Sequence, residues 1–312
     1  MSACFGPASS SPGLVSVVIP CFRQAHFLAD GIESVLRQTY RRFEVLVIND
    51  GSPDDTARVA SRYPVRYVEQ PHAGLAAARN AGLQRALGEF VVFLDADDRL
   101  LPDALRINVS RLRADSALAF VAGASRYIAR DGTPLYTNPP HIASGDLYEV
   151  LLRRNRIRMP AMVMFRRAIF ERVGDFDTRL DACADYDLYL RVSRLCAAAL
   201  HDELVAEYRR HEGNMSLNSA RMLRQFSIVM RRQRKRVNGD AGLIAAVDEG
   251  LRNMQEYYGD QIADGIRARV RARKELHSAI ADAGRLLVLY PRGLFVHVWR
   301  KASRQSRYRR SS

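Results

Sequence analysis

Three carboxylates follow directly on a run of apolar residues in the stretch FVVFLDADD, which contains Asp95, Asp97 and Asp98. Like charges repel one another, and a carboxylate needs solvent, a hydrogen-bond donor or a cation. Side chains repeat every two residues in an extended segment, so Asp95 and Asp97 are expected on the same side. Two such groups suit Mg2+ or Mn2+, which takes its other ligands from phosphate and water. The alternative is a solvated loop in which Asp98 caps the helix after Leu100.

Three residues in the first third of the chain could bind a nucleotide. Asp50 could accept a hydrogen bond from a base N–H or a ribose hydroxyl, or it could be a turn residue before Gly51. Arg79 suits a pyrophosphate or a base carbonyl, or it could lie on a solvated helix face. Phe22 could stack on a base or close the core.

Two further candidates lie in the second half of the chain. Asp185 and Asp187 fall in the first turn of an expected amphipathic helix, where the helix dipole favours carboxylates, so capping is the alternative to a general base. His211, in the stretch YRRHEGNMS, could be a metal ligand or a phosphate contact, or an ordinary loop histidine.

The elements that would position these residues alternate between strands and helices from residue 14 to residue 86. The stretches LVSVVIP, FEVLVI, VRYVEQ and FVVFL predict buried strands, the first of them stopped by Pro20. The segments between them have helical spacing or helix caps. Strands buried on both faces and joined by helices predict an α/β fold with a mostly parallel sheet flanked by helices. Because ligands bind outside the carboxyl ends of such strands, residues 20–22, 49–51 and 95–97 should line one crevice.

After residue 102 the pattern predicts the second half of the domain and then a helical region of different composition. LPDALRINVSRLRAD, DLYEVLLRR and DYDLYLRVSRL indicate helices, SALAFVAGASRYIARDGTPL a hairpin, and MPAMVMFRRAIFERVG a strand followed by a helix. Beyond residue 219 the sequence is rich in arginine and helical. We therefore expect a disordered lead over residues 1–13, a domain over 14–217 with halves at 14–100 and 101–217, and a basic helical region over 218–312.

Taken together, these stretches resemble the family-two inverting glycosyltransferases with the GT-A fold. The resemblance covers about residues 14–216 and is carried by VSVVIPCF, FEVLVINDGSPDDT, GLAAARNAGL, GEFVVFLDADD, MFRRAIFERVGDFD, ADYDLYLRV and YRRHEGNMS, in that order. It implies transfer of a sugar from a nucleotide-diphosphate sugar, with a uridine nucleotide favoured and a dTDP or GDP donor as the alternative. The acceptor would be a hydroxyl of a glycan or a lipid-linked molecule.

The resemblance also implies roles for individual residues. Asp50 would contact the base, and Arg79 would lie beside the nucleotide. Asp95 would meet the ribose or the metal, Asp97 would coordinate the metal, and Asp185 would be the catalytic base. His211 would lie near the metal or the diphosphate, and Pro20 and Phe22 would belong to the donor-binding loop.

Two positions depart from the family's pattern. Ala184 stands where the first residue of an acidic pair is common, which leaves Asp185 as the candidate base. Arg23 stands where a small polar residue is common in the donor-binding loop.

The implied mechanism can be argued from charge. Cleavage of the sugar–phosphate bond leaves negative charge on the diphosphate, which Mn2+ or Mg2+ and Arg79 would stabilise. Asp185 would take the proton of the attacking hydroxyl, a step that typically contributes about 10²–10⁴-fold. One displacement inverts the anomeric carbon and needs no covalent nucleophile on the enzyme.

Net charge and missing motifs bear on the alternative classes of protein. The net charge of +14 over 312 residues suggests an anionic partner and keeps open a non-catalytic protein that binds an anionic surface or nucleic acid. No nucleic-acid motif occurs, so no nucleic-acid partner is expected. The loop PCFRQAHF lacks the glycines of a nucleotidyltransferase phosphate loop, and the GxGxxG of dinucleotide-dependent oxidoreductases is absent.

The location follows from what the sequence lacks. The four cysteines form no zinc or CxxC spacing, which indicates reduced thiols of a cytoplasmic protein. The N-terminal residues lack the features of a signal peptide, and no apolar run approaches the ~18–20 residues of a membrane span. Aromatic and basic residues mix in residues 284–301, which suggests peripheral attachment to an anionic membrane face, with packing on the catalytic domain as the alternative. The C-terminal helices could also support an oligomer.

Overall fold

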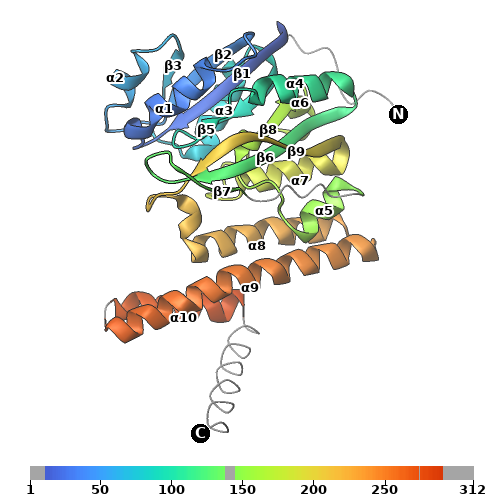
Figure 1. Ribbon diagram of the computed structural model, residues 1–312. Helices are drawn as coiled ribbons and strands as arrows, with labels where there is room; N and C mark the ends of the chain where they lie inside the picture. Colours follow the sequence, from blue (N-terminus) through green and yellow to red (C-terminus); the bar gives the residue numbers. More distant parts are fainter. Residues whose placement is uncertain (1–10, 138–144, 274, 291–312) are drawn as a thin grey trace, which may run out of the picture. The chain divides into compact units, whose positions relative to one another are not determined.

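The computed structural model describes residues 11–137, 145–273 and 275–290 (Figure 1). The chain divides into two compact units. The first unit runs to Leu151 and then from Asn155 to Glu212, and the second comprises Leu152–Arg154 and the chain from Gly213 onward.

The first half of the sheet in unit 1 is parallel, as the sequence predicts. Its order is β3 (Arg66–Glu69), β2 (Phe43–Asn49), β1 (Ser11–Cys21) and β4 (Gly88–Phe93). Helices α1 (Ala25–Leu36), α2 (Thr56–Ala60) and α3 (Leu75–Arg85) lie between these strands in the sequence. Because the strands are parallel, their carboxyl ends lie along one edge of the sheet.

Strand β1 is longer than predicted at both ends. It begins at Ser11, whose backbone N–H donates to the carbonyl of Leu87 at 2.9 Å, so the predicted disordered lead stops at least three residues earlier than expected. Residues 1–10 of that lead lie outside the described residues. At the other end Pro20 does not stop the strand, because it stays in register with Ile48 and the pairing continues through Cys21.

The second half of the sheet is mixed. Beyond β4 the order is β8 (Val163–Arg166), β6 (Leu118–Ile128), β9 (Ala197–Arg209) and β5 (Arg99–Leu100), and β7 (Pro134–Thr137) forms the predicted hairpin with β6. Strand β8 is antiparallel to both of its neighbours, whereas β6 and β9 are parallel. The other helices of this part of the chain are α4 (Ala104–Ala114), α5 (Leu147–Arg153), α6 (Ile169–Val173) and α7 (Ala184–Leu195).

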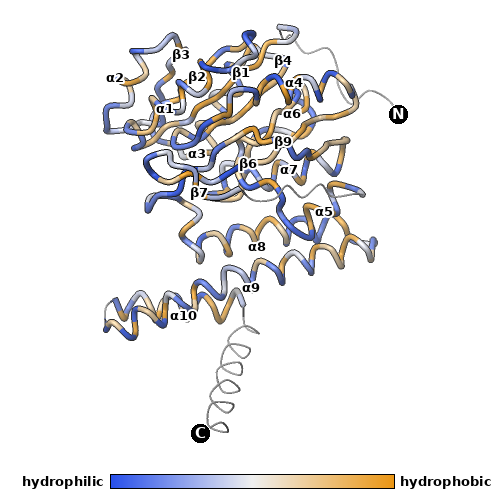
Figure 2. The backbone as a smooth tube through the Cα atoms, in the orientation of Figure 1, coloured by the Kyte–Doolittle hydropathy of each residue, from blue (hydrophilic) through white to orange (hydrophobic). Residues whose placement is uncertain are grey.

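Hydrophobic residues follow the strands of the sheet (Figure 2), and most of those in β1, β2 and β4 are buried. Helix α3 lies unusually close to the sheet at Gly82, where a Cβ atom would be only 2.2 Å from Cγ1 of Val18. Arg79 precedes Gly82 by three residues and therefore lies on the same side of the helix. The close approach brings that side of α3 down onto β1.

Unit 2 is helical over its described residues after the short turn Met215–Leu217. It contains α8 (Ser219–Arg236), α9 (Ala241–Ala272) and α10 (Leu276–Leu289). Asn218 caps α8 and Asp240 caps α9, each by accepting a hydrogen bond from a backbone N–H three residues later. The buried core consists of Leu223, Tyr258, Ile262, Leu286 and Tyr290. Among the described residues, no helix is long and apolar enough to cross a membrane.

Candidate active site

Asp50 follows β2 directly, and its buried carboxylate is held by the loop that leads into α3. It accepts hydrogen bonds from the backbone N–H groups of Ala73 and Gly74, both at 2.9 Å, and from Nε2 of Gln70 at 2.7 Å. Nδ1 of His72 lies 2.8 Å from the same carboxylate. Asp50 therefore fixes the entry to α3 at the carboxyl edge of the sheet.

An aromatic pair lies beside Asp50. The rings of Phe22 and His72 are stacked with their centroids 4.0 Å apart, and the guanidinium of Arg23 lies 5.3 Å from the centre of the Phe22 ring. Arg23 has a φ of 57°, a left-handed conformation that is uncommon for a residue other than glycine. Phe22 is thus at the rim of the edge and not in the core, whereas Pro20 is buried within β1.

Arg79 connects α3 with the end of β4. It is buried, and its Nη2 donates to Oδ1 of Asp95 at 2.7 Å. Burial by itself lowers the pKa of Arg79, but the negative charges of Asp95 and Asp185 outweigh burial and raise it. Its Nε is buried and has no hydrogen-bond partner among the described residues. Arg79 is therefore not the solvated helix residue of the alternative reading.

Asp97 meets His211 at the same edge. Nε2 of His211 lies 2.9 Å from Oδ2 of Asp97, and Nε2 of Gln24 donates to that oxygen at 3.1 Å. Burial and the neighbouring charge of Asp95 raise the pKa of the Asp97 carboxyl, while the hydrogen bond from His211 lowers it. Two residues 114 positions apart in the sequence thus come together at this edge of the sheet.

Asp98 does not cap a helix. Its Oδ1 accepts a hydrogen bond from the backbone N–H of Arg209 at 2.9 Å, and α4 begins only at Ala104. Burial, followed by the charges of Asp97 and Asp95, raises the pKa of Asp98 well above its ordinary value. Asp98 therefore anchors the end of β9 to the loop that carries the other two carboxylates.

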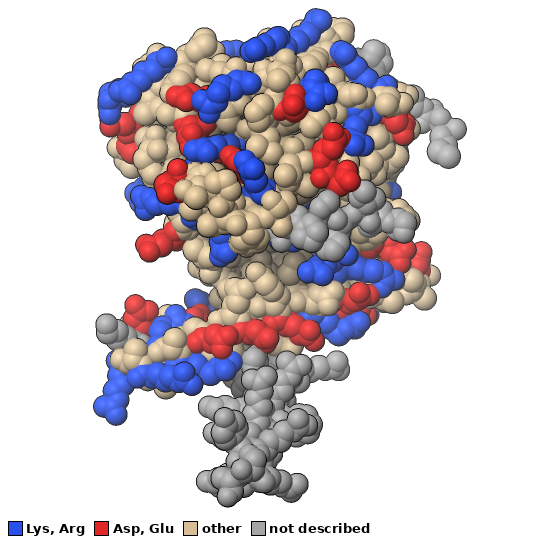
Figure 3. All heavy atoms as spheres, viewed as in Figure 1, with Lys and Arg blue, Asp and Glu red and all other residues tan. Residues whose placement is uncertain are grey.

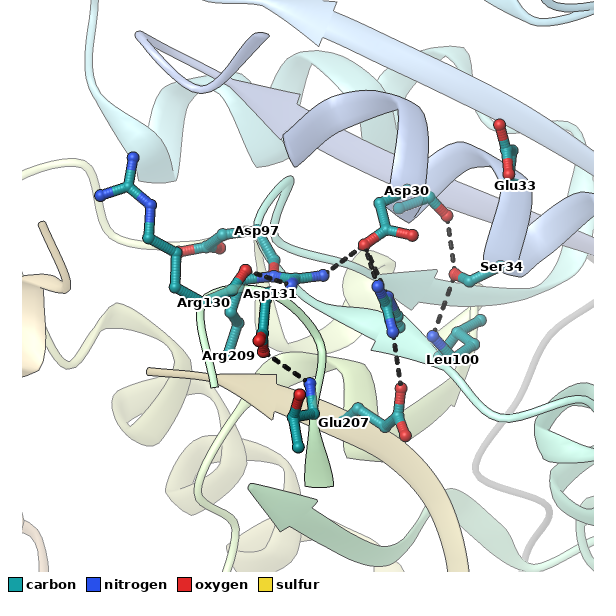
Figure 4. A network of polar contacts seen from close by, with 12 residues as sticks. Asp30, Glu33, Ser34, Asp97, Leu100, Arg130, Asp131, Glu207 and Arg209 are labelled. Carbon is teal, nitrogen blue, oxygen red and sulfur yellow. Dashed lines mark hydrogen bonds and ion pairs between the residues drawn. The ribbon is translucent and has the colours of Figure 1, made fainter. Parts of the chain in front are cut away.

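Arg209 is the functional candidate that the sequence interpretation missed. Its side chain is buried, and Figure 4 shows it at the centre of a polar network. Nε donates to the backbone carbonyl of Asp97 at 2.7 Å, Nη1 to the carbonyl of Arg130 at 2.7 Å, and Nη2 to Asp30 at 2.5 Å. The guanidinium thereby joins the carboxylate loop, the turn after β6 and helix α1.

The network extends beyond Arg209 through a second arginine. Asp30 also accepts from Arg99, and Arg99 lies 3.7 Å from Glu207, which pairs with Arg126. The signal for Arg209 was present in the stretch YRRHEGNMS, because in an extended chain Arg209 and His211 lie on the same side. That signal places Arg209 at the site only when residues 197–209 are known to form strand β9.

Asp185 lies in the first turn of α7 and is partly buried. Its Oδ1 accepts from the backbone N–H of Tyr186 at 2.8 Å. Burial raises the pKa of the carboxyl above its ordinary value, and the positive charge of Arg79 opposes that shift. Asp187 is committed to a different interaction, because it pairs with Arg191 at 2.7 Å on the same helix.

The surroundings of Asp185 include one of the two departures from the family pattern. Ala184 is buried, so an acid at that position would need a partner inside the protein. Cys183, just before α7, has a φ of 62°, which is a strained conformation for this residue. Tyr189 lies one turn after Asp185, and its buried hydroxyl has no hydrogen-bond partner within the described part of the chain.

The candidate ligand atoms at this edge suit a divalent cation that takes most of its ligands from phosphate and water. Asp97 and His211 offer an oxygen and a nitrogen within 2.9 Å of each other, while Asp95 is paired with Arg79. Over residues 11–137, 145–273 and 275–290, no group of three His, Cys, Asp or Glu residues has the spacing of a metal cage. Mg2+ and Mn2+ suit such a sparse set, because phosphate and water complete their shells.

The sequence model of the family described as "Glycosyl transferase family 2" matches residues 16–174, which is half of the chain. The chain belongs to glycosyltransferase family 2. It is an enzyme of the glycosyltransferase class, as the sequence predicts, and the matched region contains Asp50, Arg79, Asp95 and Asp97.

Curated relatives resemble the chain over part of its length. An uncharacterized glycosyltransferase of Rickettsia conorii is 30% identical over 212 residues, which are 64% of this chain and 34% of the relative. Chondroitin synthase of Pasteurella multocida is 29% identical over 189 residues, which are 58% of this chain and 19% of the relative. The chain thus spans about a third or less of the length of these two relatives.

Solved structures confirm the predicted GT-A fold class. Residues 1–349 of S. aureus TarS in complex with UDP-GlcNAc match with a TM-score of 0.62 and 17% identity, over 87% of this chain and 89% of that one. The mannosyltransferase PcManGT of Pyrobaculum calidifontis in complex with GDP-Man and Mn2+ matches with a TM-score of 0.55 and 21% identity, over 88% and 86%. The likeness extends beyond the region that the family model matches.

Proposed function

We propose that this glycosyltransferase moves a sugar from a nucleotide-diphosphate sugar to a hydroxyl group by a single displacement that inverts the anomeric carbon. The observation that carries the proposal is the position of Arg79. It is buried, it pairs with Asp95 at 2.7 Å, and the negative charge of Asp185 contributes to its raised pKa. One buried cation therefore links the acids of the donor site to the proposed base.

The proposed donor is a uridine-diphosphate sugar. The support is that TarS binds UDP-GlcNAc and UDP in its solved complexes, although PcManGT with GDP-Man keeps a guanosine donor open. In this chain Asp50 would accept from a base N–H, and the aromatic pair of Phe22 and His72 offers a surface on which a base can stack. Arg79 would lie beside the diphosphate.

The proposed cofactor is Mn2+ or Mg2+, held by Asp97 and His211, with Asp95 beside them to meet the ribose or the metal. When bound, it would supply positive charge to the leaving diphosphate. The raised pKa of Asp97 reflects burial and the negative charge of Asp95, so a cation at this position would favour the ionised carboxylates. The presence of Mn2+ in the PcManGT complex supports this part of the proposal.

The proposed general base is Asp185. Its carboxylate would take the proton of the acceptor hydroxyl as that oxygen attacks the face of the sugar opposite the diphosphate. Burial raises its pKa, which makes the carboxylate a stronger proton acceptor than a solvated aspartate. No covalent nucleophile takes part, because one displacement completes the transfer.

The acceptor and the location complete the proposal. We propose a glycan or lipid-linked acceptor, with the donor bound by residues 14–100 and the acceptor by residues 101–217. The proposed location is the cytoplasm, on the inner face of the membrane. The helical unit would provide contacts with a membrane or with a second copy of the chain.

The test is a donor screen followed by a transfer assay. Thermal unfolding of the full chain would be recorded with UDP-, dTDP- and GDP-sugars in the presence of Mn2+, because a ligand of the native state raises the apparent stability. We expect a rise with a UDP-sugar that disappears in EDTA. The product anomer would then be assigned by NMR. Retention of the donor's configuration, or full turnover in EDTA, would contradict the proposal.

A further inference from the structure

Helix α10 leaves one apolar side uncovered. Leu286 on this helix and Tyr290 just after it lie in the core of the helical unit. In contrast, the exposed fractions of Leu276, Ile280, Leu287 and Val288 are 48%, 74%, 53% and 76%. These four large apolar residues are exposed on one helix of 14 residues.

The spacing places three of these residues on one stripe and the fourth beside it. Leu276, Ile280 and Leu287 are four and then seven residues apart, which puts them on one side of an α-helix, and Val288 widens that side. We call these four residues the α10 stripe. The acid Asp282 belongs to a different side, because it accepts from Arg269 and Arg285.

Two cations precede the α10 stripe at the junction of α9 and α10, where Glu275 is also exposed. Arg271 and Arg273 are exposed there, beside the exposed apolar side chain of Val270. Figure 3 shows Lys and Arg side chains gathered at this end of the helical unit. Apolar residues bordered by arginines match the chemistry of an anionic bilayer, in which acyl chains lie beneath negative headgroups.

The composition of the following chain points to the same occupant. Residues 291–312 include six arginines and one lysine and contain no Asp or Glu. A second copy of the same surface would bring Arg271 and Arg273 close to the same residues of the other copy, which disfavours self-association at this face. An anionic bilayer instead complements both the stripe and the charge that continues after it.

We propose that the α10 stripe, together with Arg271 and Arg273, binds the surface of an anionic lipid bilayer. The helix would lie in the interface without spanning it, which agrees with the absence of a membrane-crossing helix in the described chain. This surface belongs to the helical unit and does not depend on the proposed reaction. Loss of lipid binding and loss of transfer can therefore be measured separately.

The first experiment measures co-sedimentation of the full chain with vesicles of phosphatidylcholine, with and without phosphatidylglycerol. We compare Ile280→Glu with Leu87→Glu, because Leu87 is also an exposed apolar residue, lies in unit 1 and receives the same change of charge. Ile280→Glu is expected to lower the partition coefficient on anionic vesicles at least about tenfold. Leu87→Glu is expected to leave it unchanged.

The second experiment tests the cations. Arg271→Gln combined with Arg273→Gln is compared with Arg41→Gln combined with Arg62→Gln, which removes the same charge from exposed positions in unit 1. The first pair is expected to weaken binding about fivefold per arginine, and the control pair less. Added salt should weaken the binding of the wild-type chain, since it screens these contacts.

Several outcomes would overturn the proposal. Equal binding to neutral and anionic vesicles would show that Arg271 and Arg273 do not contribute to binding. Equal loss in Ile280→Glu and Leu87→Glu would show a general effect of charge and not a specific stripe. If Ile280→Glu converts a dimer into a monomer in analytical ultracentrifugation and leaves vesicle binding intact, the stripe is an interface between copies of the chain.

Discussion

The two units depart from the usual distribution of residues in opposite ways. In the first, Asp97, Asp98 and Arg209 are buried next to one another, although charged residues are seldom buried. In the second, Ile280 and Val288 remain in solvent on a helix whose other side builds a core. The first departure concentrates charge where the proposed diphosphate and its metal would lie. The second concentrates apolar surface on one helix side.

The comparison shows that the two kinds of unusual residue place different demands on the stability of the protein. Buried charges must be paired, so the first unit needs the network of Arg209, Asp30 and Arg99 simply to keep its carboxylates together. Exposed apolar residues need no partner to keep the protein folded, so the second unit carries its departure at little structural cost. Substitutions in the network of the first unit should therefore lower stability, whereas substitutions of the exposed apolar residues of α10 should leave stability nearly unchanged.

The largest expected effect concerns Asp185. Asp185→Asn should lower kcat about 10²–10⁴-fold, because the amide cannot accept the proton of the acceptor hydroxyl. Donor affinity, measured by calorimetry with Mn2+ present, should change little. Asp202→Asn, at an exposed position on β9, is the control and should keep full turnover. A fall in donor affinity equal to the fall in kcat would move Asp185 to the donor site.

The same residue predicts a pH dependence. The base must be unprotonated, and burial raises the pKa of Asp185 above its ordinary value of 3.8. We therefore expect kcat to fall as the pH is lowered through that raised pKa, and to approach a tenfold loss per pH unit below it. The residual activity of Asp185→Asn should lack this acidic limb. An unchanged limb in the variant would assign it to another group.

The next effect concerns the metal. Asp97→Asn should lower turnover by at least about a hundredfold, because an amide is a weak ligand for a hard cation and the leaving group loses its Lewis acid. Mn2+ should no longer increase the affinity for UDP in calorimetry, a readout that does not require turnover. Activity of the wild-type protein should vanish in EDTA and return with Mn2+ or Mg2+. Normal Mn2+-dependent binding of UDP by the variant would exclude Asp97 as a ligand.

The third effect tests whether the buried network is structural. Arg209→Gln should lower the free energy of unfolding by about 3 kcal/mol, because it removes a buried guanidinium that pairs with the partly exposed Asp30 and donates to two backbone carbonyls. Arg210→Gln changes the neighbouring, exposed arginine and should cost little. Urea denaturation measures both. Equal stabilities would show that the network is not needed to hold the carboxylate loop.

The smallest effects compare the two sides of the helical unit. Leu223→Ala should lower the stability of the protein by about 2–5 kcal/mol, since it opens a cavity in the core of that unit. Ile280→Ala should change it by less than about 0.5 kcal/mol, because that side chain is already in solvent. Chemical denaturation followed by circular dichroism distinguishes the two. A large loss in Ile280→Ala would mean that the α10 stripe is covered within the protein.

Much of the first half could be predicted from the sequence because its signals are local. The runs ending at Ile48 and Phe93 consist mostly of β-branched and aromatic residues, and the carboxylates that follow them had to fall at the carboxyl edge of a parallel sheet. The meeting of Asp97 with His211 followed only from the family resemblance. No local pattern relates two residues 114 positions apart.

The missed features depend on contacts between distant segments. Strand β9, AAALHDELVAEYR, lacks a regular alternation, and its pairing with β6 shifts register, so its sequence did not predict a strand. Without β9, Arg209 had no place at the site. The stacking of His72 on Phe22 was equally hidden, because it joins the loop before α3 to the end of β1.

The close approach of α3 to β1 has a consequence for attempts to change donor preference by mutation. A methyl group at Gly82 would meet the stiff, branched side chain of Val18, so helix α3 would have to move outward to admit even alanine. Arg79 would move with it and lose its alignment with Asp95. A position that carries no reactive group therefore limits the donor site. Libraries that vary Phe22 and His72 should leave Gly82 unchanged, since they would otherwise mix altered recognition with a displaced arginine.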